Sequence, residues 1–135
     1  MRPLPEVQAE IREVLKDIMH DVETANVAGL RASHLESNKF TKFGGRDFER
    51  QDVEQCNEAE TRFVSTLQNL KLEMRDPKID VFGDVAIMTC YNHVSYTDDG
   101  EVRNRVARNT LVFLNTDDGW KIVHEHVTPN ARFEQ

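Results

Sequence analysis

Apolar residues recur at helical spacing through the first half of the chain and at alternate positions through the second half. The stretch from Pro5 to about Thr24 has apolar residues every three or four positions, which is typical of an amphipathic helix. Asn26 is a good N-cap for a short second helix. Phe40 to Phe43 reads as a short strand ending at Gly44-Gly45, and a third helix is predicted from about Gln51 to Gln68.

The second half predicts four long strands joined by tight turns. Asp76-Pro77 interrupts the first strand, which indicates a bulge or a sheet edge because proline cannot donate to a strand ladder. Asp98-Asp99-Gly100 and residues 116–119 are strong hairpin loops. The strands are Leu70 to Phe82, Val85 to Thr97, Val102 to Asn115 and Trp120 to Thr128. The pattern therefore predicts an α+β domain with helices on one face of a curved antiparallel sheet.

Both faces of the Val85 to Thr97 strand are apolar. An antiparallel sheet with one face in water normally alternates apolar and polar side chains more cleanly. Three helices can cover only one face of the sheet, so the other face needs a different cover. A second copy of the chain is the simplest cover, and we expect a homodimer.

Composition narrows the class of protein. The 135 residues suffice for one domain, predicted over residues 1–135, and the net charge of −7 disfavours nucleic-acid binding. The two cysteines, Cys56 and Cys90, have no motif spacing and read as buried apolar residues rather than disulfide or metal ligands. No segment approaches the ~20 apolar residues of a membrane span, and the N-terminus lacks a signal-peptide pattern. We therefore expect a cytoplasmic protein without a membrane partner.

Five segments carry a resemblance to a known family: Asp76-Pro77, Asp80 to Asp84, Tyr96 to Asp98, Arg108 to Thr110 and Gly119 to Thr128. With the order of elements, they resemble the cone-shaped nuclear transport factor 2-like fold of ketosteroid isomerases and SnoaL-like cyclases, a cystatin-like α+β roll. The C-terminal half is most similar to the association domain of calcium/calmodulin-dependent protein kinase type II and its small bacterial relatives. The resemblance implies that the N-terminal helices pack on the concave face of the sheet.

The chain departs from that family at its functional positions. The kinase association domain lines its pocket with arginines on three strands, and the matching positions here are Asn92, Leu111 and Val127. The catalytic carboxylates of the isomerases are also missing from the matching places. The resemblance therefore implies the fold, but neither an arginine pocket nor the isomerase activity.

The loops predict which residues face each other across the sheet. The loop at 98–100 places Cys90 opposite Asn109 and Met88 opposite Leu111. The second hairpin has two possible registers, and a slip of one residue turns every side chain to the other face. A bulged register puts Glu125 on the concave face beside Asn109, whereas a plain register puts His126 there. The resemblance favours the bulged register.

On the bulged register, the concave face forms a mostly apolar floor with a few polar groups, which is typical of a small-molecule site. The predicted pocket consists of Met88, Cys90, Asn92, Asn109, Leu111, Phe113, Val123 and Val127. A carboxylate on such a floor can act as a general acid or base, which makes Glu125 a catalytic candidate. The alternative is a structural ion pair between Glu125 and a helix arginine such as Arg62.

The opposite, convex face is predicted to form the dimer contact through Tyr91, Arg108, Thr110 and His124. In the plain register His126 would replace Glu125 as the acid–base candidate. His93 and His126 share the convex face with His124, but too few further ligands accompany them for zinc. No metal and no cofactor is expected.

Three functions follow from these patterns. The first is a homodimeric domain that binds a small hydrophobic or carboxylate ligand in an apolar pocket without turnover. The second is an acid–base enzyme, an isomerase, cyclase or hydrolase, that uses Glu125 or His126. The third is a self-association module, which the resemblance to the kinase association domain suggests.

Overall fold

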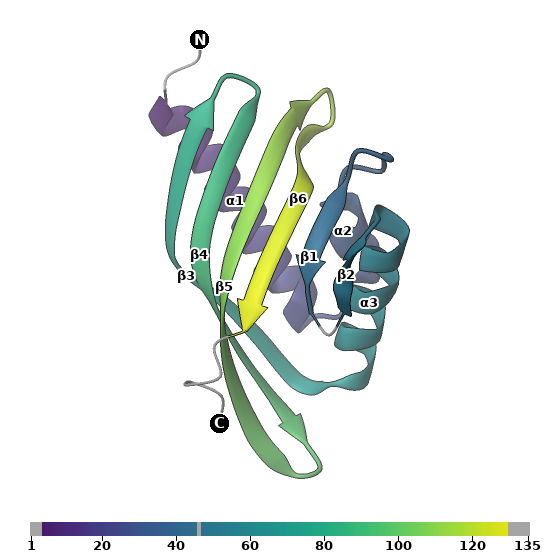
Figure 1. The fold of residues 1–135 in the computed structure, drawn as a ribbon. Coiled ribbons are helices and arrows are strands. Elements are labelled where there is room, and N and C mark those ends of the chain that lie inside the picture. Colours follow the sequence, from purple (N-terminus) through teal and green to yellow (C-terminus); the bar gives the residue numbers. More distant parts are fainter. Residues whose placement is uncertain (1–3, 46, 130–135) are drawn as a thin grey trace.

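The computed structural model describes residues 4–45 and 47–129, and in these residues three helices pack on one face of a curved six-stranded sheet (Figure 1). The elements in chain order are α1 (Leu4–Glu23), α2 (Val27–Ala32), β1 (Thr41–Gly44), β2 (Asp47–Gln51), α3 (Val53–Thr66), β3 (Gln68–Phe82), β4 (Val85–Asp98), β5 (Glu101–Thr116) and β6 (Gly119–Pro129). The two ends of the predicted domain, residues 1–3 and 130–135, lie outside the described residues.

The helices begin and end where local chemistry predicts. The Asn26 side chain accepts a hydrogen bond from the Gly29 N–H at 3.1 Å and so caps α2. Asp52 and Gln55 form a reciprocal capping box at the start of α3, with both bonds at 2.9 Å. The predicted apolar stripe of α1 is buried at Val7, Ile11, Leu15, Ile18 and Val22. Among the described residues, no helix is both long and apolar enough to cross a membrane.

The sheet has the strand order β2-β1-β6-β5-β4-β3. Strands β3 to β6 form the predicted antiparallel meander, and β1 adds to β6 in parallel. The register of β3 shifts between Arg75 and Lys78, and Asp76 has a φ of 53°. The interruption at Asp76-Pro77 is therefore both a bulge and part of an edge strand. Strand β2 was not predicted, because Phe48 is its only apolar residue.

The core lies between the concave face and the helices, and Figure 1 shows α1 crossing behind β3 to β6. Each large apolar side chain buried here contributes roughly 1.5–3 kcal/mol to folding. The most deeply buried large side chains are Phe40, Phe113, Ile11, Met88 and Leu111. In this part of the chain the sheet therefore has one face covered by helices and one left open.

The register confirms the first predicted hairpin and corrects the second. Cys90 faces Asn109 as predicted, but Asn109 faces Val127 rather than Glu125. A bulge in the middle of β6 leaves Val123 without a partner, so Glu125 lies opposite Leu111. The favoured register was wrong by two residues at this point. Because side chains alternate with a period of two, that error leaves Glu125 on the concave face.

Candidate functional site

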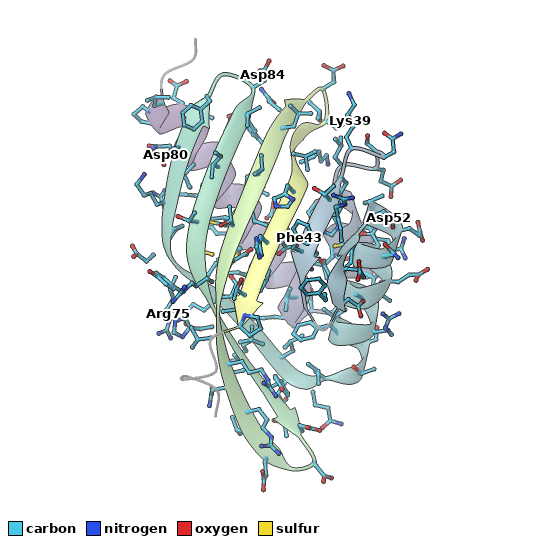
Figure 2. The ribbon with its side chains drawn as sticks, in the orientation of Figure 1. Lys39, Phe43, Asp52, Arg75, Asp80 and Asp84 are labelled. Carbon is cyan, nitrogen blue, oxygen red and sulfur yellow. The ribbon has the colours of Figure 1, made fainter. Side chains whose placement is uncertain are left out.

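Charged side chains from separate parts of the chain meet inside the cone. Lys42 lies on β1 directly beside Glu125 of β6, and Glu60 comes from α3. Figure 2 labels two residues near these side chains in sequence: Phe43, which follows Lys42 on β1, and Asp52, which caps α3. Together with two further side chains they form the interior cluster, which we define as His34, Lys42, Cys56, Glu60 and Glu125.

Local structure explains why these side chains converge. Cys56 and Glu60 are four residues apart on α3, so they lie on the same face of the helix. His34 follows α2 and is held against β6, because Ile122 hydrogen-bonds through its backbone to Ser33 and Leu35, each at 2.8 Å. The positions of the cluster therefore depend on regular backbone elements.

The Glu60 carboxylate is the centre of the interior cluster. Its Oε2 atom lies 3.3 Å from His34 Nε2, 3.3 Å from Cys56 Sγ and 3.7 Å from Lys42 Nζ. Lys42 Nζ also lies 3.3 Å from Glu125 Oε1. Two carboxylates and two cations are thus joined in one network, and their formal charges cancel.

His34 is a buried cation in this network. Its Nδ1–H donates to Asn57 Oδ1 at 2.8 Å, and its Nε2–H points to Glu60. Burial opposes the charge on the ring, but the contacts with Cys56 and Glu60 prevail and raise the pKa of His34 to about 11. The ring therefore carries a proton on both nitrogens at neutral pH.

Lys42 and Glu60 are also kept in their charged forms by neighbouring groups of opposite charge. Burial alone would disfavour the Lys42 ammonium, yet Glu125 and then Glu60 raise the pKa of Lys42 above its ordinary value. Burial likewise disfavours the Glu60 carboxylate, but His34 and Lys42 lower the pKa of Glu60 below its ordinary value. A general acid or base works best when its pKa lies near the working pH. His34, Lys42 and Glu60 are therefore poorly suited to proton transfer at pH 7.

A second polar group lies beside the interior cluster on the concave face. The Cys90 thiol donates to Asn92 Oδ1 at 3.3 Å, and Asn109 Nδ2 donates to the same oxygen at 3.4 Å. Burial and the nearby Glu125 charge raise the pKa of the Cys90 thiol to about 12. Asn109 Oδ1 is buried and has no hydrogen-bond partner among the described residues. An unsatisfied buried acceptor costs about 1–3 kcal/mol, so this oxygen favours the binding of a donor.

The interior cluster is within reach of solvent. The exposed fraction of the side chain is 23% for Glu60, 13% for Glu125 and 12% for Lys42. His34 is almost fully buried behind them. A molecule that approaches the cluster from solvent therefore meets the two carboxylates and the ammonium first.

The residues of the predicted pocket lie on or near the concave face. Met88, Cys90, Asn109, Leu111 and Phe113 are buried, whereas Asn92, Val123 and Val127 are half-buried. Two hollows, of about 380 and 760 Å³, are lined by other described residues, around Val64 and Leu70 and around Phe43 and Phe48. The pocket above this floor therefore stays a prediction.

The two catalytic candidates lie on opposite faces of the sheet. Glu125 lies inside, but its partner is Lys42 rather than the suggested Arg62. His126 is exposed on the convex face, where its ring centroid lies 5.8 Å from that of Phe43. The plain register holds next to the loop, from Thr116 opposite Gly119 to Phe113 opposite Ile122. The bulge at Val123 ends it, so Asn109 faces Val127 and His126 does not lie beside it.

The residues predicted to form the dimer contact lie together on the convex face. Tyr91 faces Arg108, and Thr110 faces His126 in the neighbouring row. His124 Nδ1 lies 2.8 Å from the Thr41 hydroxyl, which explains the orientation of that ring.

Sequence reasoning missed most of the interior cluster. Lys42 lies within the short strand predicted at Phe40 to Phe43, and His34 has no ionisable partner in a local motif, so the sequence pattern made neither of them a site candidate. A local signal did exist, because Cys56 is followed four residues later by Glu60 on the inner face of the same helix. The pairing of Lys42 with Glu125 has no local signal, since β1 and β6 are far apart in sequence.

Comparison with known proteins agrees with the cone-shaped fold. A proposed dehydratase of the nuclear transport factor 2-like family from Streptomyces avermitilis superposes with a TM-score of 0.85 at 16% identity, covering 96% of this chain and 99% of that one. A nuclear transport factor 2-like superfamily protein from Salmonella enterica serovar Typhimurium has a TM-score of 0.81 at 22% identity, covering 97% and 96%.

A third solved structure is described as an association domain of the kind that the C-terminal motifs resemble. It is a proposed calcium/calmodulin-dependent protein kinase II association domain from Xanthomonas campestris, with a TM-score of 0.73 at 17% identity, covering 97% of this chain and 90% of that one. No curated protein matches the chain significantly in sequence. These likenesses show that the chain has the fold described for these structures as nuclear transport factor 2-like and cystatin-like.

The family can be stated more narrowly. Residues 11–130 match the model of the SnoaL-like domain. The chain therefore belongs to the SnoaL-like family.

The charge on His34 predicts how stability depends on pH. Above about pH 6.5 the unfolded chain releases the second proton of the His34 ring. The folded protein keeps that proton, because the pKa of His34 is raised in the folded state. The stabilisation is complete below about pH 6.5 and is lost as pH rises toward the folded pKa, at most about 1.4 kcal/mol per pH unit. In metal-free buffer, urea unfolding between pH 6.5 and 9 should show this falling slope in the wild type and a weaker one in His34→Gln.

The control is His20→Gln, which removes an exposed histidine from α1 and should leave the slope unchanged. Equal slopes in the wild type and His34→Gln would contradict the assignment of a buried imidazolium.

Proposed function

We propose that this protein is a homodimeric small-molecule-binding domain, with its ligand on the concave face beside the interior cluster. The buried Asn109 Oδ1 atom, which has no hydrogen-bond partner among the described residues, is the observation that carries this proposal. The body of the ligand would lie against half-buried floor residues such as Val127, which faces Asn109, because Met88, Leu111 and Phe113 are already covered by the helices. The partly exposed side chains of Lys42, Glu60 and Glu125 would lie at its polar end.

The site favours a ligand that carries a hydrogen-bond donor, such as a hydroxyl or an amide N–H. Asn109 Oδ1 can only accept, and Glu60 and Glu125 present further acceptors. A carboxylate ligand would be repelled by both carboxylates, and the Lys42 ammonium already pairs with them. A mostly apolar molecule with one donor group is therefore favoured over a carboxylate ligand.

Binding without turnover fits the charges of the interior cluster. His34 and Glu60 form a matched ion pair whose pKa values are moved in opposite directions, away from neutral pH. Such a pair stays in its charged form and is poorly suited to proton transfer at neutral pH.

An acid–base enzyme is the second candidate, and one observation favours it. Glu125 is a carboxylate at the edge of an apolar floor, 3.3 Å from an ammonium that could stabilise a developing oxyanion. The Streptomyces avermitilis structure is itself described as a proposed dehydratase. In this reading Glu125 would act as the base and Lys42 as the electrophile.

The ligand proposal is tested by thermal unfolding of the metal-free protein with pairs of small aromatic and alicyclic molecules. The two members of each pair share one skeleton. One member carries a hydroxyl or an amide, and the other carries a carboxylate. The donor-bearing member should raise Tm and the carboxylate should not. Asn109→Leu should weaken binding of the donor-bearing member by about tenfold, which corresponds to about 1.4 kcal/mol.

The matched control is Asn104→Leu, which changes an exposed asparagine on the same strand. No Tm shift with any pair, or equal binding by Asn109→Leu, would rule out the proposed ligand site. Turnover of a bound ligand that is lost in Glu125→Gln would favour the enzyme instead.

The homodimer is proposed from the convex face. In the described residues the helices lie on the other side of the sheet, so apolar side chains here remain uncovered (Figure 1). Tyr91 is 48% exposed, Phe43 38% and Ile87 37%. An isologous contact between two convex faces would bury these side chains with Arg108 and Thr110, since aromatic residues and arginine are enriched in interfaces.

The dimer is tested by sedimentation velocity at micromolar concentration. The wild type should sediment as a dimer, and Ile87→Glu should be a monomer because it places a charge in the contact. Leu4→Glu changes an exposed apolar residue of α1, away from this face, and should remain dimeric. A monomeric wild type would contradict the proposal, and a larger ring would favour the self-association module.

A further inference from the structure

Three metal-ligating atoms of different chemistry converge inside the interior cluster. His34 Nε2 and Glu60 Oε2 are 3.3 Å apart, and Cys56 Sγ and Glu60 Oε2 are also 3.3 Å apart. The third side of the triangle, from Cys56 Sγ to His34 Nε2, measures 3.9 Å. Glu125 offers a fourth atom, and all four lie within 4.8 Å of one another.

These separations resemble the edges of a tetrahedral zinc site. With Zn–N and Zn–O bonds of about 2.0 Å and a Zn–S bond of about 2.3 Å, tetrahedral angles put nitrogen and oxygen about 3.3 Å apart, and sulfur about 3.5 Å from either. The observed separations differ from these values by at most about 0.4 Å. Small side-chain rotations would therefore complete the geometry.

The hydrogen bond at the other ring nitrogen of His34 also supports a metal site. Metal-ligating histidines usually donate their other ring N–H to a fixed acceptor, which orients the ligating nitrogen. Here Asn57 Oδ1 accepts from Nδ1 at 2.8 Å, so Nε2 points toward Cys56 and Glu60. Asn57 belongs to α3, the same helix that carries Cys56 and Glu60, so two of the ligands and the orienting acceptor lie on one helix.

We propose that His34, Cys56 and Glu60 form a binding site for a divalent transition metal of the Zn²⁺ class, with Glu125 or a water molecule as the fourth ligand. Mixed nitrogen, sulfur and oxygen donors suit Zn²⁺ and Co²⁺, whereas Mg²⁺ and Ca²⁺ prefer oxygen alone. This site differs from the one weighed in the sequence, since His124 and His126 lie on the convex face. It shares Glu60 and Glu125 with the polar end of the proposed ligand site, but a different observation, the convergence of His34, Cys56 and Glu60, supports it.

Charge does not oppose the metal. Without a metal, the formal charges of a His34 imidazolium and the Glu60 carboxylate cancel beside a neutral Cys56 thiol. Metal ligands bind in deprotonated form, so a divalent ion would replace one proton on the ring and one on the thiol. The net charge of the three side chains plus ion stays zero.

The Lys42–Glu125 pair can remain in place when the ion binds. Lys42 Nζ is closer to Glu125, at 3.3 Å, than to Glu60, at 3.7 Å. Lys42 can therefore stay outside the coordination sphere with Glu125, and a water molecule then takes the fourth position. Access is through the Glu60 side chain, which is 23% exposed.

The test is a Co²⁺ titration of the tag-free, reduced, metal-free protein followed by absorption spectroscopy. The expected result is one equivalent of Co²⁺ with the visible bands of a tetrahedral site and a thiolate-to-cobalt charge-transfer band, both removed by Zn²⁺. Cys56 and Cys90 are the only cysteines in the chain, so their variants assign the band. Cys56→Ser should lose it and bind about tenfold or more weakly, whereas Cys90→Ser should keep it.

Circular dichroism shows whether the Cys56→Ser variant folds. If it does not fold, a second measurement on the wild type still tests the proposal. Crystals of the wild type grown with Zn²⁺ should show an anomalous peak between His34 Nε2, Cys56 Sγ and Glu60 Oε2. A wild type without the charge-transfer band, or a band that persists in Cys56→Ser, overturns the proposal. The ligand measurements use metal-free protein, so the two proposals fail separately.

Discussion

The interior of this protein is arranged around one carboxylate, whose negative charge must be compensated by nearby cations. The Glu60 side chain is mostly buried, with 23% of its surface exposed, and leaving a buried charge unpaired costs about 3–5 kcal/mol. His34 and Lys42 come to it from the segment after α2 and from β1, and each is held by backbone pairing with β6. The carboxylate therefore ties α3 to the edge of the sheet. Because the cluster is neutral as a whole, it can be buried without an outside counterion.

The bulge in β6 links this cluster to the rest of the concave face. The unpaired Val123 moves Glu125 opposite Leu111, at the border between the apolar floor and the charged groups. The same strand presents His124 and His126 to the convex face, next to β1. One strand thus contributes to both proposed surfaces, the ligand site inside and the dimer contact outside. A change in its register would alter both at once.

Local chemistry in the sequence predicted most of the fold. The stripe of α1, the Asn26 cap and the loop at 98–100 each act over a few residues, so their consequences could be read from short windows. The bulge at Val123 could not, because its neighbours Ile122 and His124 fit a regular strand equally well. Strand β2 has too little apolar content to be recognised.

The site was harder to predict than the fold because it depends on contacts between distant segments. Glu125 was placed inside correctly, but its partner Lys42 arrives through a parallel pairing that no loop length determines. Long-range pairing also brings His34 to Glu60. The sequence around His34 gives no indication that this histidine is charged. Polar residues inside a fold are predictable only when their partners are known, since an unpaired one is too costly to bury.

The central claim is that the cone contains a charged, neutralised network rather than a purely apolar interior. Long-range ¹H–¹⁵N correlation spectroscopy of the histidine rings in the metal-free protein at pH 8 tests it most directly. The account predicts that both nitrogens of the His34 ring carry a proton at this pH, because the pKa of His34 is raised to about 11. A neutral ring with one protonated nitrogen at pH 8 would contradict it.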